Sequence, residues 1–400
     1  MKLKNVLLVA LFFSYFFMNS QENPFSTKWD NGFKIENADK SIKMKFGGRL
    51  MYDFGFFSLN NKAETNGYTL ASENGNEFRR ARLFTSGTIY KNIDFKLQVD
   101  FTGGEVTLKD AYITLKKLPA VGNLRVGHFK EPYRLEALTS SKYITFMERA
   151  LPISMIPERN SGFMLFNESA NKRMSWQIGL FRGADKATSD SPEANGDYAI
   201  TSRIAGAVLN KENSLLHLGL SYSYRKPQEN HSFGYSVRPE VHISNKYIQT
   251  NVSGVDNVHL FNFETAWVAN SFSLQGEYSA ANVNSSLNDE NFTSYYLQAS
   301  YFLTGEKRVY KNSMDGFDRV KPASNFGENG IGALEVALRY SGIDGMNNDK
   351  MGNITAGLNW HLNPATRIMA NYVISNIENN TQYHGDGQFN AFQMRFQIDF

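Results

Sequence analysis

Apolar and polar residues alternate with a period of two along this chain, and that pattern constrains its fold more than any other feature. The alternation is clearest at the end of the chain, where polar residues separate Phe392, Met394, Phe396, Ile398 and Phe400. Successive side chains of a strand point to opposite faces, so such a segment forms a strand with one apolar and one polar face. The pattern recurs with no amphipathic helix of ordinary length between the repeats. It therefore predicts an all-β fold.

Sixteen such strands are predicted, joined by connections that alternate between short and long. Their ranges are 42–54, 77–90, 93–102, 106–117, 122–130, 160–168, 173–183, 197–209, 214–225, 257–269, 272–282, 292–303, 331–343, 351–362, 366–377 and 389–400. Each is near the length that a tilted strand needs to cross a bilayer. Short turns at one end and long polar loops at the other are typical of an outer-membrane barrel. We expect a 16-stranded antiparallel transmembrane β-barrel with both termini on the periplasmic side, and a soluble β-sandwich is the alternative.

The only long apolar run stands at the N-terminus. Lys2 and Lys4 precede an apolar core from Val6 to Met18, and polar residues return at Asn19. This core is too short to span a bilayer as a helix, so it predicts a signal peptide rather than an anchor. We expect a cleaved signal peptide over residues 1–20, an N-terminal periplasmic segment over 21–41 and an outer-membrane barrel over 42–400. A retained N-terminal anchor is the alternative.

Composition excludes several classes of function. The chain has no cysteine, so it has no disulfide and no thiolate metal site. Lys and Arg number 42 against 39 Asp and Glu, a balance that argues against a nucleic-acid binder. The seven histidines show no paired metal spacing, and no nucleophile elbow or Walker loop is present. We therefore expect no enzyme and no cofactor, although a barrel enzyme or a surface-binding barrel remains a less favoured alternative.

The polar face of each strand is expected to line the interior, because the apolar face must meet lipid. Basic residues modestly outnumber acidic residues on that inner face, and sixteen strands are enough to leave an aqueous channel. Segment 131–159 is less polar than an outer loop should be, and segment 304–330 is long although it falls on the short-turn side. We expect both to fold into the lumen. Basic rings are typical of an anion or phosphate pore, and a charge-paired wall around a wet lumen is the alternative.

Four stretches of the chain resemble the phosphate-selective porin family of O and P type. They are Glu77–Leu83 (EFRRARL), Leu135–Lys142 (LEALTSSK) with Glu148-Arg149, Tyr301–Tyr310 (YFLTGEKRVY) with Lys311 and Val320–Pro322, and the strand that contains Arg339-Tyr340. The resemblance covers the chain from about residue 41 to the end. It implies a homotrimeric 16-stranded porin whose third outer loop and long periplasmic turn enter the lumen. The implied function is passive anion diffusion, with phosphate or polyphosphate as the leading solutes.

The resemblance also implies an anion site at the constriction. Its candidate residues are Arg79, Arg80, Ser140, Ser141, Lys142, Lys311 and Lys321. The candidate basic residues that line the pore are Arg49, Arg82, Lys109, Arg203, Arg225 and Arg238. Arg79 and Arg80 are adjacent, so both reach the lumen only if a β-bulge interrupts the alternation. Salt bridges in the wall are the alternative role for the arginines, and helix capping is the alternative for the serines.

One position departs from the family pattern. Phosphate-selective members carry a lysine after the Leu-Glu of the constriction loop, where this chain has Ala137. One central positive charge is therefore missing, which leaves anion preference as the prediction and weakens strict phosphate selectivity. A general or carbohydrate porin with little charge selectivity is the alternative. We expect small anions, outer-membrane lipid and identical subunits as partners, and no nucleic acid.

Overall fold

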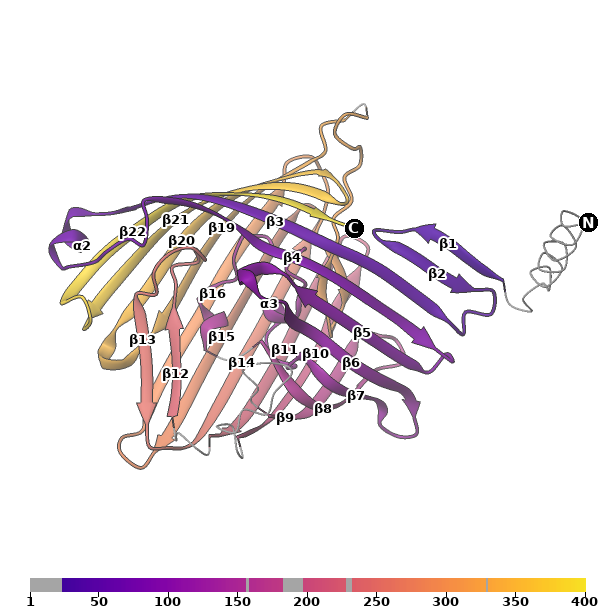
Figure 1. Ribbon diagram of the computed structural model, residues 1–400, viewed down its shortest axis with the longest axis horizontal. Helices are drawn as coiled ribbons and strands as arrows, with labels where there is room; N and C mark the ends of the chain where they lie inside the picture. The colour runs from indigo at the N-terminus through magenta and orange to yellow at the C-terminus, as the bar shows by residue number, and fades with distance from the viewer. Residues whose placement is uncertain (1–23, 156–157, 183–196, 228–231, 329) are drawn as a thin grey trace, which may run out of the picture.

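The computed structural model describes residues 24–155, 158–182, 197–227, 232–328 and 330–400, and the predicted signal peptide over 1–20 lies outside these ranges. Sixteen antiparallel strands close into a barrel, because the last strand pairs with the first (Figure 1). The barrel strands are β3 (Lys43–Leu59), β4 (Asn74–Ile89), β5 (Ile93–Asp100), β6 (Thr107–Leu118), β7 (Gly122–Lys130), β8 (Arg159–Glu168), β9 (Met174–Arg182), β10 (Tyr198–Lys211), β11 (Ser214–Lys226), β14 (Val255–Ala269), β15 (Phe272–Ser285), β16 (Glu290–Phe302), β19 (Ala333–Asp344), β20 (Lys350–Asn363), β21 (Thr366–Asn380) and β22 (Gly385–Asp399). The predicted barrel is confirmed, and closure leaves it without an open edge.

The two faces of the strands divide as predicted. In β22 the side chains of Phe392, Phe396 and Ile398 are 39%, 46% and 44% exposed on the outside of the barrel. The neighbouring Arg395 is 0% exposed, because its side chain points inward. The outer wall is thus apolar, as a lipid-facing surface requires.

The short turns use backbone conformations that suit tight hairpins. Tyr90 and Lys91, between β4 and β5, both have positive φ angles, 49° and 67°. Two successive positive φ angles match the right-handed twist of the flanking strands. At the closing seam, Gly48 and Phe400 exchange two backbone hydrogen bonds of 2.7 and 3.1 Å. The C-terminal residue therefore completes the pairing of β22 with β3.

Several smaller elements lie outside the sixteen strands. They are the hairpin of β1 (Phe25–Trp29) and β2 (Phe33–Asn37), the hairpin of β12 (Ser232–Val237) and β13 (Ile248–Ser253), the hairpin of β17 (Val309–Asn312) and β18 (Gly316–Asp318), the helices α2 (Asn61–Thr65) and α3 (Leu135–Leu138), and the 3₁₀ turns η1 (Thr102–Gly104), η2 (Leu151–Ser154) and η4 (Met346–Asn348). The β1–β2 hairpin extends the sheet from β3 and projects beside the C-terminus (Figure 1). In the described ranges, no helix combines the length and the apolar character needed to cross a membrane.

Two connections enter the barrel from its opposite ends. Residues 131–158, which we call the inner loop, join β7 to β8 and include α3, which Figure 1 places in the middle of the barrel. Residues 303–332, which we call the long turn, join β16 to β19 and include β17 and β18. The two meet inside, where the Phe317 amide donates to Thr139 Oγ1 at 3.4 Å. Segments 131–159 and 304–330 thus meet in the lumen, where the sequence analysis expected them.

Candidate functional site

The inner loop is held against the barrel wall by four of its glutamates. Their basic partners are Arg225 for Glu131, Arg339 for Glu136, Arg79, Arg80 and Arg395 for Glu148, and Lys130, Arg149 and Arg159 for Glu158. All of these partners except Arg149, which lies in the inner loop itself, come from barrel strands. A buried charge is tolerated only when it is paired and hydrogen-bonded, so these contacts fix where the loop can lie.

A β-bulge directs two adjacent arginines toward Glu148. Met51 pairs with Arg80 and Tyr52 pairs with Phe78, which leaves Arg79 as an extra residue in β4. Arg79 binds the Glu148 carboxylate with two hydrogen bonds of 2.8 and 2.9 Å, and Arg80 approaches it at 3.8 Å. The bulge that the two arginines required is present. In this arrangement both arginines face a carboxylate of the chain itself.

The charge of Glu148 is secured by its surroundings. Burial alone would raise the pKa of Glu148, but the positive charges of Arg79, Arg80 and Arg395 hold it well below its ordinary value. A carboxylate that accepts several charge-assisted hydrogen bonds stays ionised. Glu148 is thus an anionic anchor for the inner loop.

Both ends of α3 are satisfied by charged side chains. The backbone amides of Leu135 and Glu136 donate to the Glu277 carboxylate at 3.0 and 2.8 Å. At the other end Arg149 donates to the carbonyl oxygens of Ala137 and Thr139 at 3.3 and 2.9 Å. Unpaired backbone groups at helix ends need such partners when they are buried. The helix therefore presents Ser140 and Ser141, just after its end, at a fixed position.

A cavity of about 240 Å³ lies between the inner loop, the long turn and the wall. Its basic lining residues are Arg49, Arg82, Lys96, Arg125, Lys130, Arg149, Arg159 and Lys311, and its acidic lining residues are Asp110, Glu158 and Asp315. Ser140 and Ser141 line the same space. This volume is close to the lower end for small-molecule pockets, roughly 300 Å³. We call this space the lumen cavity.

Arg49 and Arg125 stand apart from the other lining cations. Arg49 donates to Ser141 Oγ at 2.7 Å and to Ser140 Oγ at 3.5 Å. Arg125 donates to Thr114 Oγ1 at 3.2 Å. Among the described residues, neither guanidinium has a carboxylate within ion-pair distance. Their positive charge is therefore not neutralised by an ion pair within the described chain.

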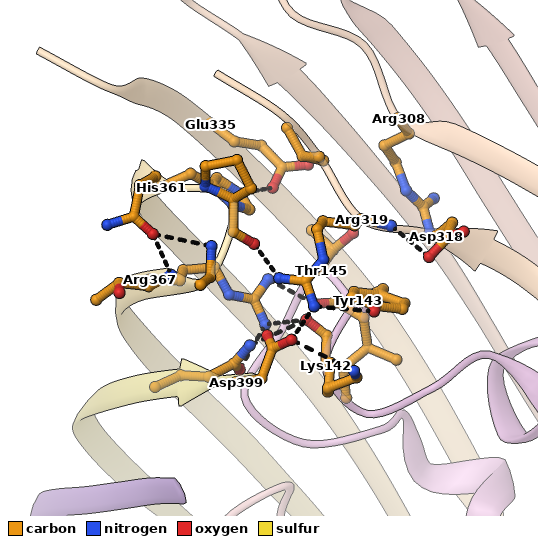
Figure 2. Close-up of a pocket in the computed structure, with 17 residues that line it drawn as sticks. Lys142, Tyr143, Thr145, Arg308, Asp318, Arg319, Glu335, His361, Arg367 and Asp399 are labelled. Atoms are coloured by element: carbon orange, nitrogen blue, oxygen red, sulfur yellow. Dashed lines mark hydrogen bonds and ion pairs between the residues drawn. The ribbon is translucent and has the colours of Figure 1, made fainter. Parts of the chain in front are cut away.

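Lys142 lies beside a second, smaller cavity of about 30 Å³ (Figure 2). Figure 2 shows Lys142 and Arg319 converging on Asp399, and Lys142 Nζ is 3.3 Å from the Asp399 carboxylate. Burial lowers the pKa of Lys142 to about 8, although Asp399 acts in the opposite direction. Lys142 therefore carries a positive charge at neutral pH that is already paired within the chain.

The structure places the remaining candidate residues in different surroundings. Lys311 lines the lumen cavity and pairs with Asp315 at 2.7 Å, with both side chains half exposed. Lys321 is exposed and lines a separate cavity of about 510 Å³ together with Lys307. Lys109 is the extra residue of a bulge between β5 and β6 and does not line the lumen cavity.

The other three candidate arginines hold loops or turns. Arg203 binds Glu264 and donates to the Ser313 carbonyl oxygen of the long turn at 2.8 Å. Arg225 binds Glu131 of the inner loop at 3.0 Å. Arg238 donates to the Ser244 carbonyl oxygen at 3.0 Å. Burial lowers the pKa of Arg238, and the positive charge of the nearby Arg79 lowers it further.

Five lining cations were not among the predicted site residues: Lys96, Arg125, Lys130, Arg149 and Arg159. Lys130 and Arg159 pair with each other across β7 and β8 immediately before the chain turns into the inner loop. The alternation assigns Lys130 to the outer face, because Phe129 beside it is buried on the inner face. Arg149 directly follows Glu148 in one of the stretches that resemble the family, and this position was the signal that could have identified it as a site residue. Within the described ranges, no group of three His, Asp or Glu residues could hold a metal ion.

The sequence matches a known family over almost all of the barrel. The family described as phosphate-selective porin O and P matches residues 44–400. Porin O of Pseudomonas aeruginosa is 27% identical over 416 residues, which cover 93% of this chain and 92% of that protein. An uncharacterized protein of Caulobacter vibrioides is 28% identical over 398 residues, which cover 94% of this chain and 78% of that protein.

Solved structures with the same fold are also porins and outer-membrane channels. An anion-selective porin from Comamonas acidovorans superposes with a TM-score of 0.58 at 13% identity, covering 90% of this chain and all of the other. The outer-membrane channel DcaP of Acinetobacter baumannii gives a TM-score of 0.56 at 11% identity, covering 90% of this chain and 98% of the other. At sequence identities of 13% and 11%, the similarity to these structures shows a shared fold only.

Proposed function

The chain belongs to the phosphate-selective porin O and P family, and from that premise we propose that it is a passive outer-membrane diffusion channel that favours anions, with phosphate or polyphosphate as the leading solutes. The observation that carries the proposal is the lining of the lumen cavity, where eight basic side chains face three acidic ones. An excess of fixed positive charge in a narrow, partly dehydrated space raises the local concentration of anions. The barrel acts as a channel rather than an enzyme.

Arg49, Ser140 and Ser141 are the groups best arranged to replace part of the hydration shell of an anion. The Arg49 guanidinium already donates to the Ser141 hydroxyl, and no carboxylate of the described chain lies within ion-pair distance of it. A guanidinium fits a tetrahedral oxyanion with two parallel hydrogen bonds. Lys311, on the long turn, adds a half-exposed ammonium to the same cavity. We propose these four residues as the solute contacts.

A general porin with little charge preference is the second candidate. It is favoured by Ala137, where the phosphate-selective pattern has a lysine, and by the ion pairing of most lumen cations. Ala137 is only 4% exposed, and its carbonyl oxygen accepts from both Lys130 and Arg149. These two cations supply positive charge near the position of the missing lysine, so anion preference remains the better proposal.

Reversal potentials in planar bilayers test the proposal. Under a potassium chloride gradient we expect the sign of an anion-preferring channel, and added phosphate should reduce the chloride current. Arg49→Gln should lower the anion-to-cation permeability ratio several-fold, because it removes an unpaired lumen charge.

Lys307→Gln is the matched control. It removes one positive charge from the long turn, but Lys307 is exposed and lines the separate cavity of about 510 Å³. A cation-preferring sign in the unmodified protein would refute the proposal. Anion preference without any effect of phosphate would demote phosphate to one anion among others.

We also propose that the protein is a homotrimer and that its signal peptide is removed near Ser20. Family membership supports the trimer, and the short apolar run before Asn19 supports the cleavage. Cross-linking of the protein in native membranes should give a ladder that ends at three subunits. N-terminal sequencing of the exported protein should begin after the apolar run, whereas an intact Met1 would indicate an anchor.

A further inference from the structure

The inner wall of the barrel is apolar along one stretch where a polar face is expected. Phe129, Met164, Phe166 and Phe181, on β7, β8 and β9, form a cluster of inward side chains that are at most 6% exposed. These strands lie side by side in Figure 1. The outward Phe163 of β8 is apolar as well and 57% exposed, so the middle of β8 is apolar on both faces. Lipid contact explains the outer face only.

This apolar stretch borders the lumen cavity rather than a sealed core. Phe129, Met164 and Phe166 all contribute to the lining, together with the partly exposed Tyr112 of β6. Met314, at the tip of the β17–β18 hairpin, packs against the cluster and lines the cavity as well. The cavity therefore combines a basic side with a side made of aromatic rings and methionines.

Arg125 is a basic lining residue that also contacts the aromatic rings of the cavity. Its guanidinium carbon lies 4.2 Å from the ring centroid of Tyr112, 5.0 Å from that of Phe166 and 5.5 Å from that of Phe129. Stacking holds the guanidinium plane while leaving its charge without a carboxylate partner in the described chain. A planar cation of this kind can contact the face of another aromatic ring as well as an anionic group.

Inorganic phosphate would use only the basic side of such a cavity. We propose that the lumen cavity also binds and passes small aromatic carboxylates, with the ring against Tyr112, Arg125 and Met314 and the carboxylate at Arg49 and Ser141. The inference rests on the proposed anion preference and names a class of solute for the same cavity. A ligand with an apolar ring and one charged group matches a cavity that has both kinds of wall.

Benzoate is the probe. In planar bilayers with potassium chloride, the concentration of benzoate that halves the chloride current should be about tenfold lower than that of acetate, because ring contacts with a guanidinium and apolar side chains add to the shared carboxylate contacts. Benzyl alcohol carries the ring without the charge and should block only at much higher concentration.

Two variants remove the ring contacts while the barrel keeps its charge. Arg125→Lys retains the positive charge but lacks the stacking plane, and Met314→Ser changes the tip of the long turn without altering a barrel strand. Each should reduce the benzoate-to-acetate preference to about threefold or less. For Met314→Ser the reversal potential in potassium chloride should stay that of the unmodified channel, because Met314 carries no charge. Met174→Ser is the control, because Met174 is 48% exposed and does not line the cavity.

The outcomes separate this inference from the proposed function. Equal block by benzoate and acetate, in a channel that still prefers anions, would overturn the inference and leave the proposed function intact. Block by benzyl alcohol at the benzoate concentration would also overturn it, since the charge would then contribute nothing. A cation-preferring reversal potential would instead defeat the proposed function, and the inference with it.

Discussion

At the scale of single residues, the partner of each lumen cation decides what that cation can do. Arg395 binds both oxygens of Asp53 at 2.7 and 2.6 Å and also reaches Glu148, so its charge is neutralised within the chain. Arg49 meets only hydroxyl groups among the described residues. A buried ion pair fixes structure and adds little field, whereas an unpaired cation beside a cavity attracts solutes. Arg49 is therefore the better target for changing selectivity, and Arg395 for changing structure.

Lys142 belongs to an ion pair with Asp399 whose net charge depends on pH. Burial lowers the pKa of Lys142 to about 8, so the ammonium loses its proton as the pH rises through that value. The pair of Lys142 with Asp399 then loses its positive member, so the net charge of the lumen falls by one. We expect the anion-to-cation permeability ratio to fall between pH 7 and pH 9. Reversal potentials measured across this range check the expectation.

Lys142→Met should remove that pH step and lower the ratio already at pH 7. Methionine keeps the length and the apolar stem of the side chain but carries no charge. Lys307→Met serves as the control, since Lys307 is exposed outside the lumen cavity. A ratio that stays constant from pH 7 to pH 9 in the unmodified protein would show that Lys142 does not govern the field at the constriction.

At the scale of elements, Glu148 decides whether the inner loop keeps its place. The variant Glu148→Gln would leave Arg79, Arg80 and Arg395 with one negative partner fewer, at a cost on the order of 3 kcal/mol for a broken buried pair. We expect a looser loop, seen as larger current noise and as tryptic cleavage within residues 134–149 of the folded barrel. Glu105→Gln, at an exposed position, should change neither.

The same anchor should withstand mild acid. The pKa of Glu148 lies well below its ordinary value of 4.5. A group with a depressed pKa stabilises the fold fully above its unfolded pKa and loses this contribution only as the pH falls through the folded pKa. Single-channel conductance should therefore stay constant from pH 7 down to about pH 4.5. Loop release already at pH 5 would contradict the assigned anchor.

The closing seam depends on a glycine. A Cβ atom at Gly47 would lie 2.4 Å from the Phe400 carbonyl oxygen and 2.8 Å from the Phe84 ring. We expect Gly47→Val to lower the yield of the heat-modifiable folded barrel, because β22 could not pair fully with β3. Gly352→Val in β20 is the matched control, since the nearest atom to its added Cβ is the Tyr340 hydroxyl at 3.6 Å. Equal yields of folded protein, measured by gel mobility with and without heating, would contradict this account.

The alternation was enough to predict every barrel strand, because lipid on one side and water on the other impose the same period on each. It did not predict the hairpins β1–β2 and β12–β13, whose faces meet neither a continuous bilayer nor an open lumen. By strict alternation Lys130, next to the inward Phe129, would face outward, because the alternation does not indicate where the chain turns inward at the end of a strand. It also missed the inward Met164 and Phe166, since an apolar residue on the inner face needs a partner such as Met314 that only the fold brings near. The candidate site was predicted in part for the same reason: Arg49 and Ser141 lie 92 residues apart, and only the folded loop joins them.

At the scale of the whole molecule, the barrel has an apolar outer surface and a charged interior. The outer wall presents large apolar side chains, such as Leu220, Leu297 and Leu338, each more than half exposed. The interior carries the ion pairs that fix the inner loop and the long turn. A closed barrel satisfies every backbone pair between strands, so the bilayer needs to solvate only the outer side chains. The loss of unfolding free energy caused by a new outward charge should therefore depend on the depth of that charge in the membrane. It should not depend on which solutes the lumen favours.

Leu297 and Tyr301 test this depth dependence on one strand. Leu297 lies near the middle of β16 and is 53% exposed, while Tyr301 lies near its end and is 49% exposed. Leu297→Arg should lower the free energy of unfolding in lipid vesicles by about 2–4 kcal/mol, because an arginine near the midplane must be removed from water. Tyr301→Arg should cost about 0–1 kcal/mol, because the aromatic belt region is close to water. Denaturant titrations of both variants measure the difference, and equal costs would mean that the bilayer does not cover β16 as its apolar face indicates.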